Sequence, residues 1–264
     1  MLSLPFLAHL TPQIYSLLAH LLSPPPNDAT GPKPSTLTNL PTILDSLLSS
    51  PPEIKSNASD LPSYLSALTS ALIKMSLQDP VTLPSYLSKA FNLIFSNILL
   101  APAASPETLA AASEAIGAQG IARYCITDEM ILASISYARQ GSLIAGARKK
   151  QKTPFLTHLI ASVSDGFHRH ALRLPHLLPI LTALVSRLRT RVTEGSTGEV
   201  DETGRGQTAA QELLLDLVRD VGDLRTQNGF EEKAKVDEVV GMAIEVVGVQ
   251  GILEALPLNI EPDA

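Results

Sequence analysis

Prolines stand where apolar helical patterns begin, and their placement most constrains the fold of this chain. Five of its 20 prolines precede runs of apolar residues spaced three and four positions apart: Pro41, Pro62, Pro84, Pro106 and Pro154. Proline is tolerated in the first turn of an α-helix, where its missing N–H would have no partner, but it disrupts a helix interior. Each of these prolines therefore predicts a helix start.

Periodic apolar residues predict further helices at residues 128–138, 175–191, 207–224, 231–247 and 250–256. Strand signals are nearly absent, because the Asn228-Gly229 turn sequence lies between two helical patterns rather than two alternating ones. The composition is rich in leucine, and aromatic residues make up only 4% of the chain, which also favours helix over sheet. We therefore expect an all-α protein of about ten helices.

Helix starts near residues 40, 61, 84 and 106 recur at steps of about 21–23 residues, so a unit of two helices spans about 44. Armadillo and HEAT repeats have this length, whereas apolar helices joined by short turns also fit a closed bundle. We favour an armadillo/HEAT-like α-solenoid that forms one domain over residues 1–264. Two polar segments rich in proline or glycine, 23–35 and 193–206, are expected to be flexible.

Charge is sorted along the chain, although the net charge is only −6. Residues 1–120 carry a net −3, residues 121–192 a net +8 and residues 193–264 a net −11. A local excess of this size creates a field that the total charge conceals. The middle segment is therefore the predicted contact surface for an anionic partner.

The basic residues of the middle segment fall into three groups. We predict that they bind a nucleic-acid phosphate backbone or an acidic protein surface: Arg148, Lys149, Lys150 and Lys152; Arg169 and Arg173; and Arg187, Arg189 and Arg191. No interleaved aromatic residues provide a platform for stacking single-stranded bases. The first group also fits a solvated loop between two helices. Arg187, Arg189 and Arg191 are spaced two residues apart, and on a helix each step of two residues rotates the side chain by about 200°. These three side chains therefore do not form one stripe.

No catalytic or metal-binding motif accompanies the basic segment. Gly204-Arg205-Gly206 lacks the third glycine of a dinucleotide-binding loop. His168 and His170 are expected to face different sides of their helix, so we expect no metal site. Cys125, the single cysteine of the chain, is expected to be a buried core thiol rather than a nucleophile. We therefore expect no enzymatic activity, no cofactor and no small-molecule substrate.

Targeting and membrane signals are missing from the sequence pattern. Residues 1–22 lack the basic region and the cleavage site of a secretory signal. The best candidate for a membrane span, residues 91–104, is shorter than the ~18 apolar residues required and contains Asn92 and Asn97. We therefore expect an intracellular chain without membrane contact.

The C-terminal third resembles one known family in the order of its motifs. A Val- and Ile-rich helical pattern, residues 228–248, leads into a short one that ends in Leu256-Pro257-Leu258-Asn259. Over roughly residues 208–260, this order resembles the N-terminal part of the HEAT-repeat ribosomal-RNA-processing and pre-ribosome export factors. In that family a Pro-rich step and a helix containing Arg-Ala-Trp follow the tetrapeptide. This sequence stops at Ala264, so we expect either part of a longer protein or an abbreviated gene product.

The resemblance implies a non-catalytic helical-repeat scaffold in ribosome biogenesis. Such a scaffold acts in pre-rRNA processing, pre-ribosome assembly or nuclear export. Its implied partners are pre-ribosomal particles, rRNA, and assembly and transport proteins, and its implied location is the nucleus and nucleolus, with shuttling to the cytoplasm.

Two alternatives remain open at this point. The first is an armadillo-type protein–protein adaptor, related to nuclear transport receptors, that makes no contact with RNA. The second is an enzyme with an unrecognised site, which would require a fold that brings together distant polar residues such as Cys125, Asp165 and His168.

Overall fold

The computed structural model describes residues 11–23, 39–54, 58–143, 153–192 and 207–256. Beyond Ser23, the two segments expected to be flexible lie outside these residues. Eleven α-helices and no strand occur in the described part of the chain, which confirms the all-α prediction. The chain divides into two compact units, residues 1–125 and 126–264. The prediction of one domain over the whole chain stays a prediction.

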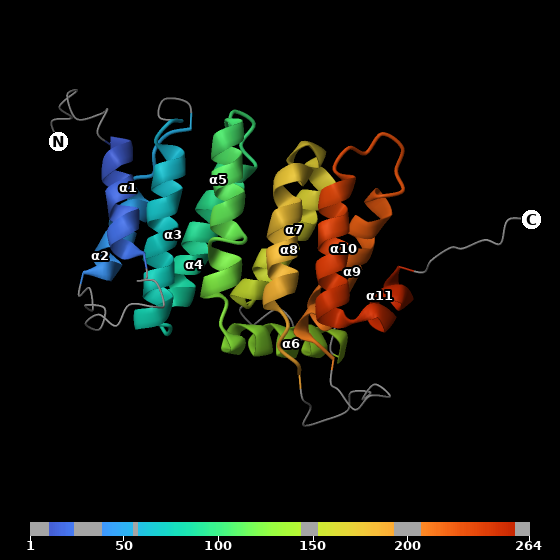
Figure 1. The fold of residues 1–264 in the computed structure, drawn as a ribbon. Coiled ribbons are helices and arrows are strands. Elements are labelled where there is room, and N and C mark those ends of the chain that lie inside the picture. Colours follow the sequence, from blue (N-terminus) through green and yellow to red (C-terminus); the bar gives the residue numbers. More distant parts are fainter. Residues whose placement is uncertain (1–10, 24–38, 55–57, 144–152, 193–206, 257–264) are drawn as a thin grey trace, which may run out of the picture. The chain divides into compact units, whose positions relative to one another are not determined.

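The first unit is a stack of helices in two layers. Its elements are α1 (Thr11–Leu22), α2 (Leu40–Ser49), α3 (Leu61–Gln78), α4 (Leu83–Asn92), the π-helix η2 (Leu93–Leu99), α5 (Pro106–Ile116) and the short π-helix η3 (Ile121–Cys125). Figure 1 shows α1, α3 and α5 side by side, with α2 and α4 behind them. Helices α2 and α4, and likewise α3 and α5, begin about 44 residues apart, as the repeat length predicted, whereas α1 begins 50 residues before α3.

The predicted prolines lie in the first turns of α2, α3, α4 and α5. Side-chain caps are less regular: Ser105 Oγ accepts a hydrogen bond from Thr108 N at 3.2 Å, whereas Asn39, Asp60 and Thr82 make no side-chain cap bond. Proline, rather than a capping side chain, is thus the signal that these helix starts share. The sequence analysis missed α1, although Pro12 is its second residue.

Helix α3 is the centre of the first unit. It packs against α1, α2, α4, α5 and η3. Tyr64 of α3 is fully buried; its hydroxyl donates a 2.8 Å hydrogen bond to Leu47 O, and its ring meets Tyr15 edge-on with 5.4 Å between centroids. These contacts tie α3 to both α2 and α1, so the burial of α3 holds the two layers together.

The helix that was predicted to start at Pro84 changes its winding at Leu93. The π-turn widens the helix, and Leu100 N donates to Phe95 O, five residues back, at 3.0 Å. Phe91 and Phe95 stack at 5.1 Å across this change, and both are buried. Packing of the apolar side chains thus accompanies the local departure from α-helical geometry.

The second unit contains α6 (Asp128–Leu143), α7 (Phe155–Arg169), the 3₁₀ turn η5 (Ala171–Arg173), α8 (Leu174–Arg187), α9 (Ala209–Leu224), α10 (Lys233–Val247) and α11 (Val249–Ala255). In Figure 1, α8 and α10 lie side by side, α7 and α9 lie behind them, and α6 runs crosswise at their ends. Two antiparallel helix pairs, α7–α8 and α9–α10, are therefore stacked through α8 and α10.

Helix α8 ends at Arg187, four residues earlier than predicted. The following residues form backbone hydrogen bonds with the segment before α9 instead: Ala210 N donates to Leu188 O at 3.0 Å, Ala209 N to Thr190 O at 2.9 Å and Val192 N to Gln207 O at 3.0 Å. Because these bonds use the backbone groups that another helical turn would need, the helix stops there.

Pro179 lies inside α8, where it cannot donate to the carbonyl of Pro175 four residues earlier. Lys235 of α10 supplies the missing donor, because its Nζ lies 3.1 Å from Pro175 O. The same ammonium pairs with Glu232 at 3.0 Å. A defect in one helix is thus repaired by the helix stacked against it.

We expect Lys235→Met to lower the free energy of unfolding by about 1 kcal/mol, because Pro175 O then loses its charged donor. The control is Lys233→Met, which removes the same charge from an exposed position on the same helix. Urea denaturation of both variants measures the difference. An equal loss in the two variants would contradict this role for Lys235.

Candidate functional site

The predicted basic site is described in part. Arg148, Lys149, Lys150 and Lys152 lie outside the described residues. The other five predicted residues lie on or next to the α7–α8 hairpin of the second unit: Arg169, Arg173, Arg187, Arg189 and Arg191. The contacts of these five arginines show which side chains are exposed to solvent and which connect helices.

The hairpin separates the five arginines into two groups. Arg169 and Arg173 lie at the turn between α7 and α8, whereas Arg187, Arg189 and Arg191 lie at the other end of α8. Helix α8 has 14 residues, so the two groups are separated by about 20 Å along the helix axis. The fold does not bring them into one pocket, and only an extended ligand would contact both. Because α8 ends at Arg187, the helical-spacing argument applied to Arg189 and Arg191 was wrong.

Arg187 is built into the fold. Its side chain is 23% exposed, its Nε donates to Ile126 O at 2.9 Å and its Nη2 lies 2.9 Å from Asp128 Oδ1. These bonds join the end of α8 to the start of α6. A guanidinium held in this way stabilises the unit and has little freedom to contact a ligand.

Arg169 and Arg189 are more exposed and have acidic neighbours. Arg169 Nε lies 2.6 Å from Asp165 Oδ1 one turn earlier in α7, and the Arg169 side chain is 73% exposed. Arg189 Nη2 lies 2.8 Å from Glu245 Oε1 of α10. Exposed ion pairs contribute little to stability, so a phosphate group could replace either carboxylate at low cost.

Arg173 and Arg191 differ in exposure. Arg173 is half-buried in η5, immediately before α8 begins. Arg191 is exposed and pairs through its backbone with Thr208. Both residues therefore occupy positions fixed by the local fold, one at each end of α8.

A pair that the sequence analysis did not single out links the basic segment to the acidic one. Arg139 of α6 binds Glu212 of α9 through two hydrogen bonds, Nε to Oε1 at 2.7 Å and Nη2 to Oε2 at 2.9 Å. Together with Arg189–Glu245, this pair shows that charges of the net +8 segment are matched by charges of the net −11 segment. The partners lie too far apart in the sequence for any local pattern to reveal them.

The cysteine and the histidines of the described residues have surroundings that can be stated one by one. Cys125 is fully buried, and burial raises the pKa of its thiol to about 12. Burial, followed by the positive charges of Lys235 and Arg173, lowers the pKa of His176. His168 Nδ1 lies 2.7 Å from Ser164 O, and its Nε2 lies 3.7 Å from Asp220 Oδ2. Within the described residues, no three His, Cys, Asp or Glu side chains are placed to hold a metal ion.

Among the helices of the described ranges, none has both the length and the apolar character needed to cross a bilayer.

Comparison with known proteins identifies the family. A family model described as "Ribosomal RNA-processing protein 12, HEAT repeats" matches residues 103–264, which is more than half of the chain. The chain belongs to this family. The match includes the motif order of residues 208–260 and extends over α5 to α11. No curated protein and no solved structure matches the chain.

Membership of the ribosomal RNA-processing protein 12 family confirms that the helices of the matched range, α5 to α11, form HEAT repeats. It implies a role in ribosome biogenesis and an association with pre-ribosomes. Proteins with these repeats are generally non-catalytic scaffolds. The matched range contains all nine residues of the predicted basic site.

We expect the Arg139–Glu212 pair to stabilise the second unit. A double-mutant cycle with Arg139→Met and Glu212→Gln should give a coupling energy of about 1 kcal/mol, because the bond is bidentate but part-exposed. The exposed pair Arg219–Asp216, measured as a reference cycle, should give less. Equal coupling in both cycles would mean that the α6–α9 link is only a surface contact.

We expect the Cys125 thiol to resist modification in the folded protein. At pH 8 a pKa of about 12 leaves little thiolate, and the buried sulfur is also inaccessible. A chromogenic disulfide reagent should therefore react only after denaturant is added. Complete reaction within seconds under native conditions would show that Cys125 is accessible and reactive.

Proposed function

We propose that this chain is a non-catalytic HEAT-repeat scaffold that acts in the nucleus and nucleolus and binds RNA within pre-ribosomal particles. Its membership of the ribosomal RNA-processing protein 12 family supports the ribosomal context. The RNA contact is made by the second unit, through basic residues of its net +8 segment.

The observation that carries this proposal is the different environment of the arginines. Arg187 makes bonds that join helices, and its side chain is only 23% exposed. Arg169 and Arg189 have side chains that are 73% and 50% exposed, and each contacts a carboxylate at the surface. A phosphate group accepts the same charge-assisted hydrogen bonds as a carboxylate. Arg169 and Arg189 can therefore exchange partners without the loss of a buried contact.

The proposal divides the basic residues by role. Arg169, Arg173, Arg189 and Arg191, together with Arg148, Lys149, Lys150 and Lys152, contact the phosphate backbone. Arg187 supports the surface indirectly, by fixing the end of α8 from which Arg189 and Arg191 follow. Binding of this kind depends on salt and is nearly independent of base sequence.

We expect charge reversal of Arg148, Lys149, Lys150 and Lys152 to Glu to weaken binding to a single-stranded ribosomal RNA fragment at least tenfold. If all four contact phosphates, the slope of log K against log salt should fall by about 3, at roughly 0.7 per contact. Adding Arg169→Glu should weaken binding further. Fluorescence anisotropy over a salt series measures both quantities.

A matched control places the same change in charge elsewhere in the second unit, at Arg205, Arg219, Arg225 and Lys233. RNA binding by this variant should stay close to that of the unmodified chain. Equal losses in both variants would contradict a localised RNA site. Partners that remain bound after nuclease treatment, together with no measurable RNA affinity, would favour the protein–protein adaptor instead.

A further inference from the structure

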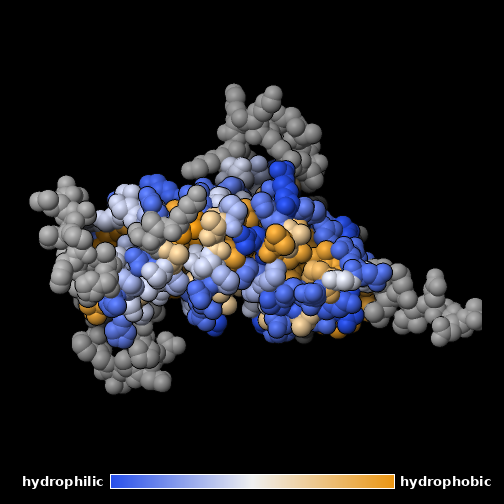
Figure 2. Space-filling view, turned by 90° about the horizontal axis from the view of Figure 1, so that it is seen from above, coloured by the Kyte–Doolittle hydropathy of each residue, from blue (hydrophilic) through white to orange (hydrophobic). Residues whose placement is uncertain are grey.

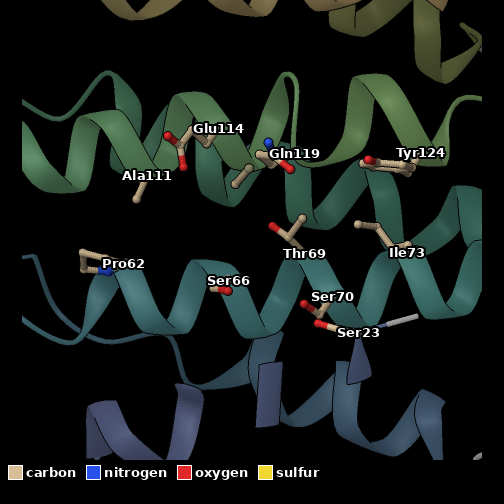
Figure 3. Close-up of a pocket in the computed structure, with 11 residues that line it drawn as sticks. Ser23, Pro62, Ser66, Thr69, Ser70, Ile73, Ala111, Glu114, Gln119 and Tyr124 are labelled. Carbon is tan, nitrogen blue, oxygen red and sulfur yellow. The ribbon is translucent and has the colours of Figure 1, made fainter. Parts of the chain in front are cut away.

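A cavity of about 450 Å³ opens between α3 and α5 of the first unit. Figure 3 shows that its walls come from α3 on one side and from α5 and the turn that follows it on the other. We call this cavity the α3–α5 groove. Its volume lies in the range of sites that hold a small ligand or a single long side chain.

Polar side chains line much of the groove, and one of them is buried without a hydrogen-bond partner. From α3 come the hydroxyls of Ser66, Thr69 and Ser70, and from the opposite side come Glu114 and Gln119. Thr69 is 6% exposed, and its Oγ1 has no hydrogen-bond partner. A buried hydroxyl without a partner is unfavourable, and native proteins keep few of them. Thr69 is therefore a hydrogen-bonding group on the α3 wall that the fold itself leaves unsatisfied.

The far wall of the groove is held in place by specific contacts. After α5 the chain turns sharply at Gly120, where a Cβ atom would lie 1.7 Å from Ala115 O, so this position requires glycine. Gln119 N donates to Glu114 O at 3.2 Å within the turn. Ser76 Oγ of α3 shares its proton between Ile73 O, at 2.7 Å in the same helix, and Tyr124 O, at 3.2 Å across the groove. The groove is thus fixed by the fold of the first unit.

The charge of the groove favours a cation. Glu114 is the one charged side chain among the described lining residues, and the described residues provide it with no ion pair. Tyr124 is 44% exposed at the groove and presents an aromatic ring. The Arg123 guanidinium lies 5.3 Å from the centre of that ring, but Arg123 does not line the groove. A groove with one carboxylate and several hydroxyl oxygens in its walls suits a cation with several N–H donors.

We propose that the α3–α5 groove binds an arginine side chain from an extended, basic protein segment. The guanidinium pairs with the Glu114 carboxylate, and its remaining N–H groups donate to the hydroxyl oxygens, including Thr69 Oγ1. The carboxylate repels phosphate, which excludes an RNA backbone as the occupant. This site goes beyond the proposed function, because it gives the first unit a protein partner while the second unit contacts RNA.

The experiment uses a fluorescein-labelled peptide of alternating arginine and glycine and the full chain. Its matched probe replaces every arginine by citrulline, which keeps the shape and removes the charge. We expect the arginine peptide to bind and the citrulline peptide to bind at least tenfold more weakly. Glu114→Gln should lower the affinity for the arginine peptide about tenfold, and Thr69→Val, which replaces the unpartnered hydroxyl by a methyl group, should lower it several-fold.

The control variant is Glu107→Gln, which removes an exposed carboxylate from the same helix outside the groove. Its peptide affinity should not change. Equal losses with Glu107→Gln and Glu114→Gln would show general attraction of a basic peptide and overturn the proposal. So would equal binding of both peptides, or loss of RNA binding in Thr69→Val.

Two readouts separate this proposal from the RNA site. Reversal of Arg148, Lys149, Lys150 and Lys152 should leave peptide binding intact, whereas Glu114→Gln should leave RNA binding intact. Circular dichroism and the melting temperature should show that Thr69→Val is folded and at least as stable as the unmodified chain, because it removes a buried polar group without a partner. Peptide binding that is lost in Thr69→Val without a loss of stability supports direct recognition.

Discussion

Each helix of this chain has an apolar stripe that only its neighbours can cover, and both units depend on this mutual burial. In the first unit α3 carries most of that role, because five other elements pack around it. In the second unit α8 and α10 pack so closely that Lys235 of α10 donates a hydrogen bond to the Pro175 carbonyl of α8. Stability in such an array comes mainly from contacts between adjacent helices. Apolar side chains left exposed on α1 and α11, and the apolar patches in Figure 2, agree with an architecture in which some faces remain uncovered.

Electrostatics is the second organising influence, and it acts across long stretches of sequence. The basic middle segment and the acidic C-terminal segment fold into one unit, where Arg139 binds Glu212 and Arg189 binds Glu245. Part of the charge that suggested an RNA surface therefore holds helices together. The remaining exposed arginines carry the proposed RNA contact, so the same type of residue has two roles that only its neighbours distinguish.

Much of the fold was predictable because its signals are local. The prolines mark the starts of α2, α3, α4 and α5, since the steric effect of the ring acts within one helical turn. The motif order near residues 228–259 indicated the family that the match over residues 103–264 confirms. The end of α8 was predicted four residues too late, because backbone bonds to the segment before α9 compete with the helix. The change to π-helix at Leu93 likewise follows from packing around Phe91 and Phe95.

The sequence by itself determined that the chain is helical, where most helices begin, how long the repeat is and which family it belongs to. These properties depend on residues within one or two turns of each other, or on the linear order of motifs. The tertiary structure decided which arginines form ion pairs between helices. It also decided that Cys125 is buried and that Thr69 and Glu114 line one groove. Those outcomes depend on residues tens of positions apart, and their side chains meet only when helices pack. The physical reason is that helix formation is local, whereas burial and ion pairing act between helices.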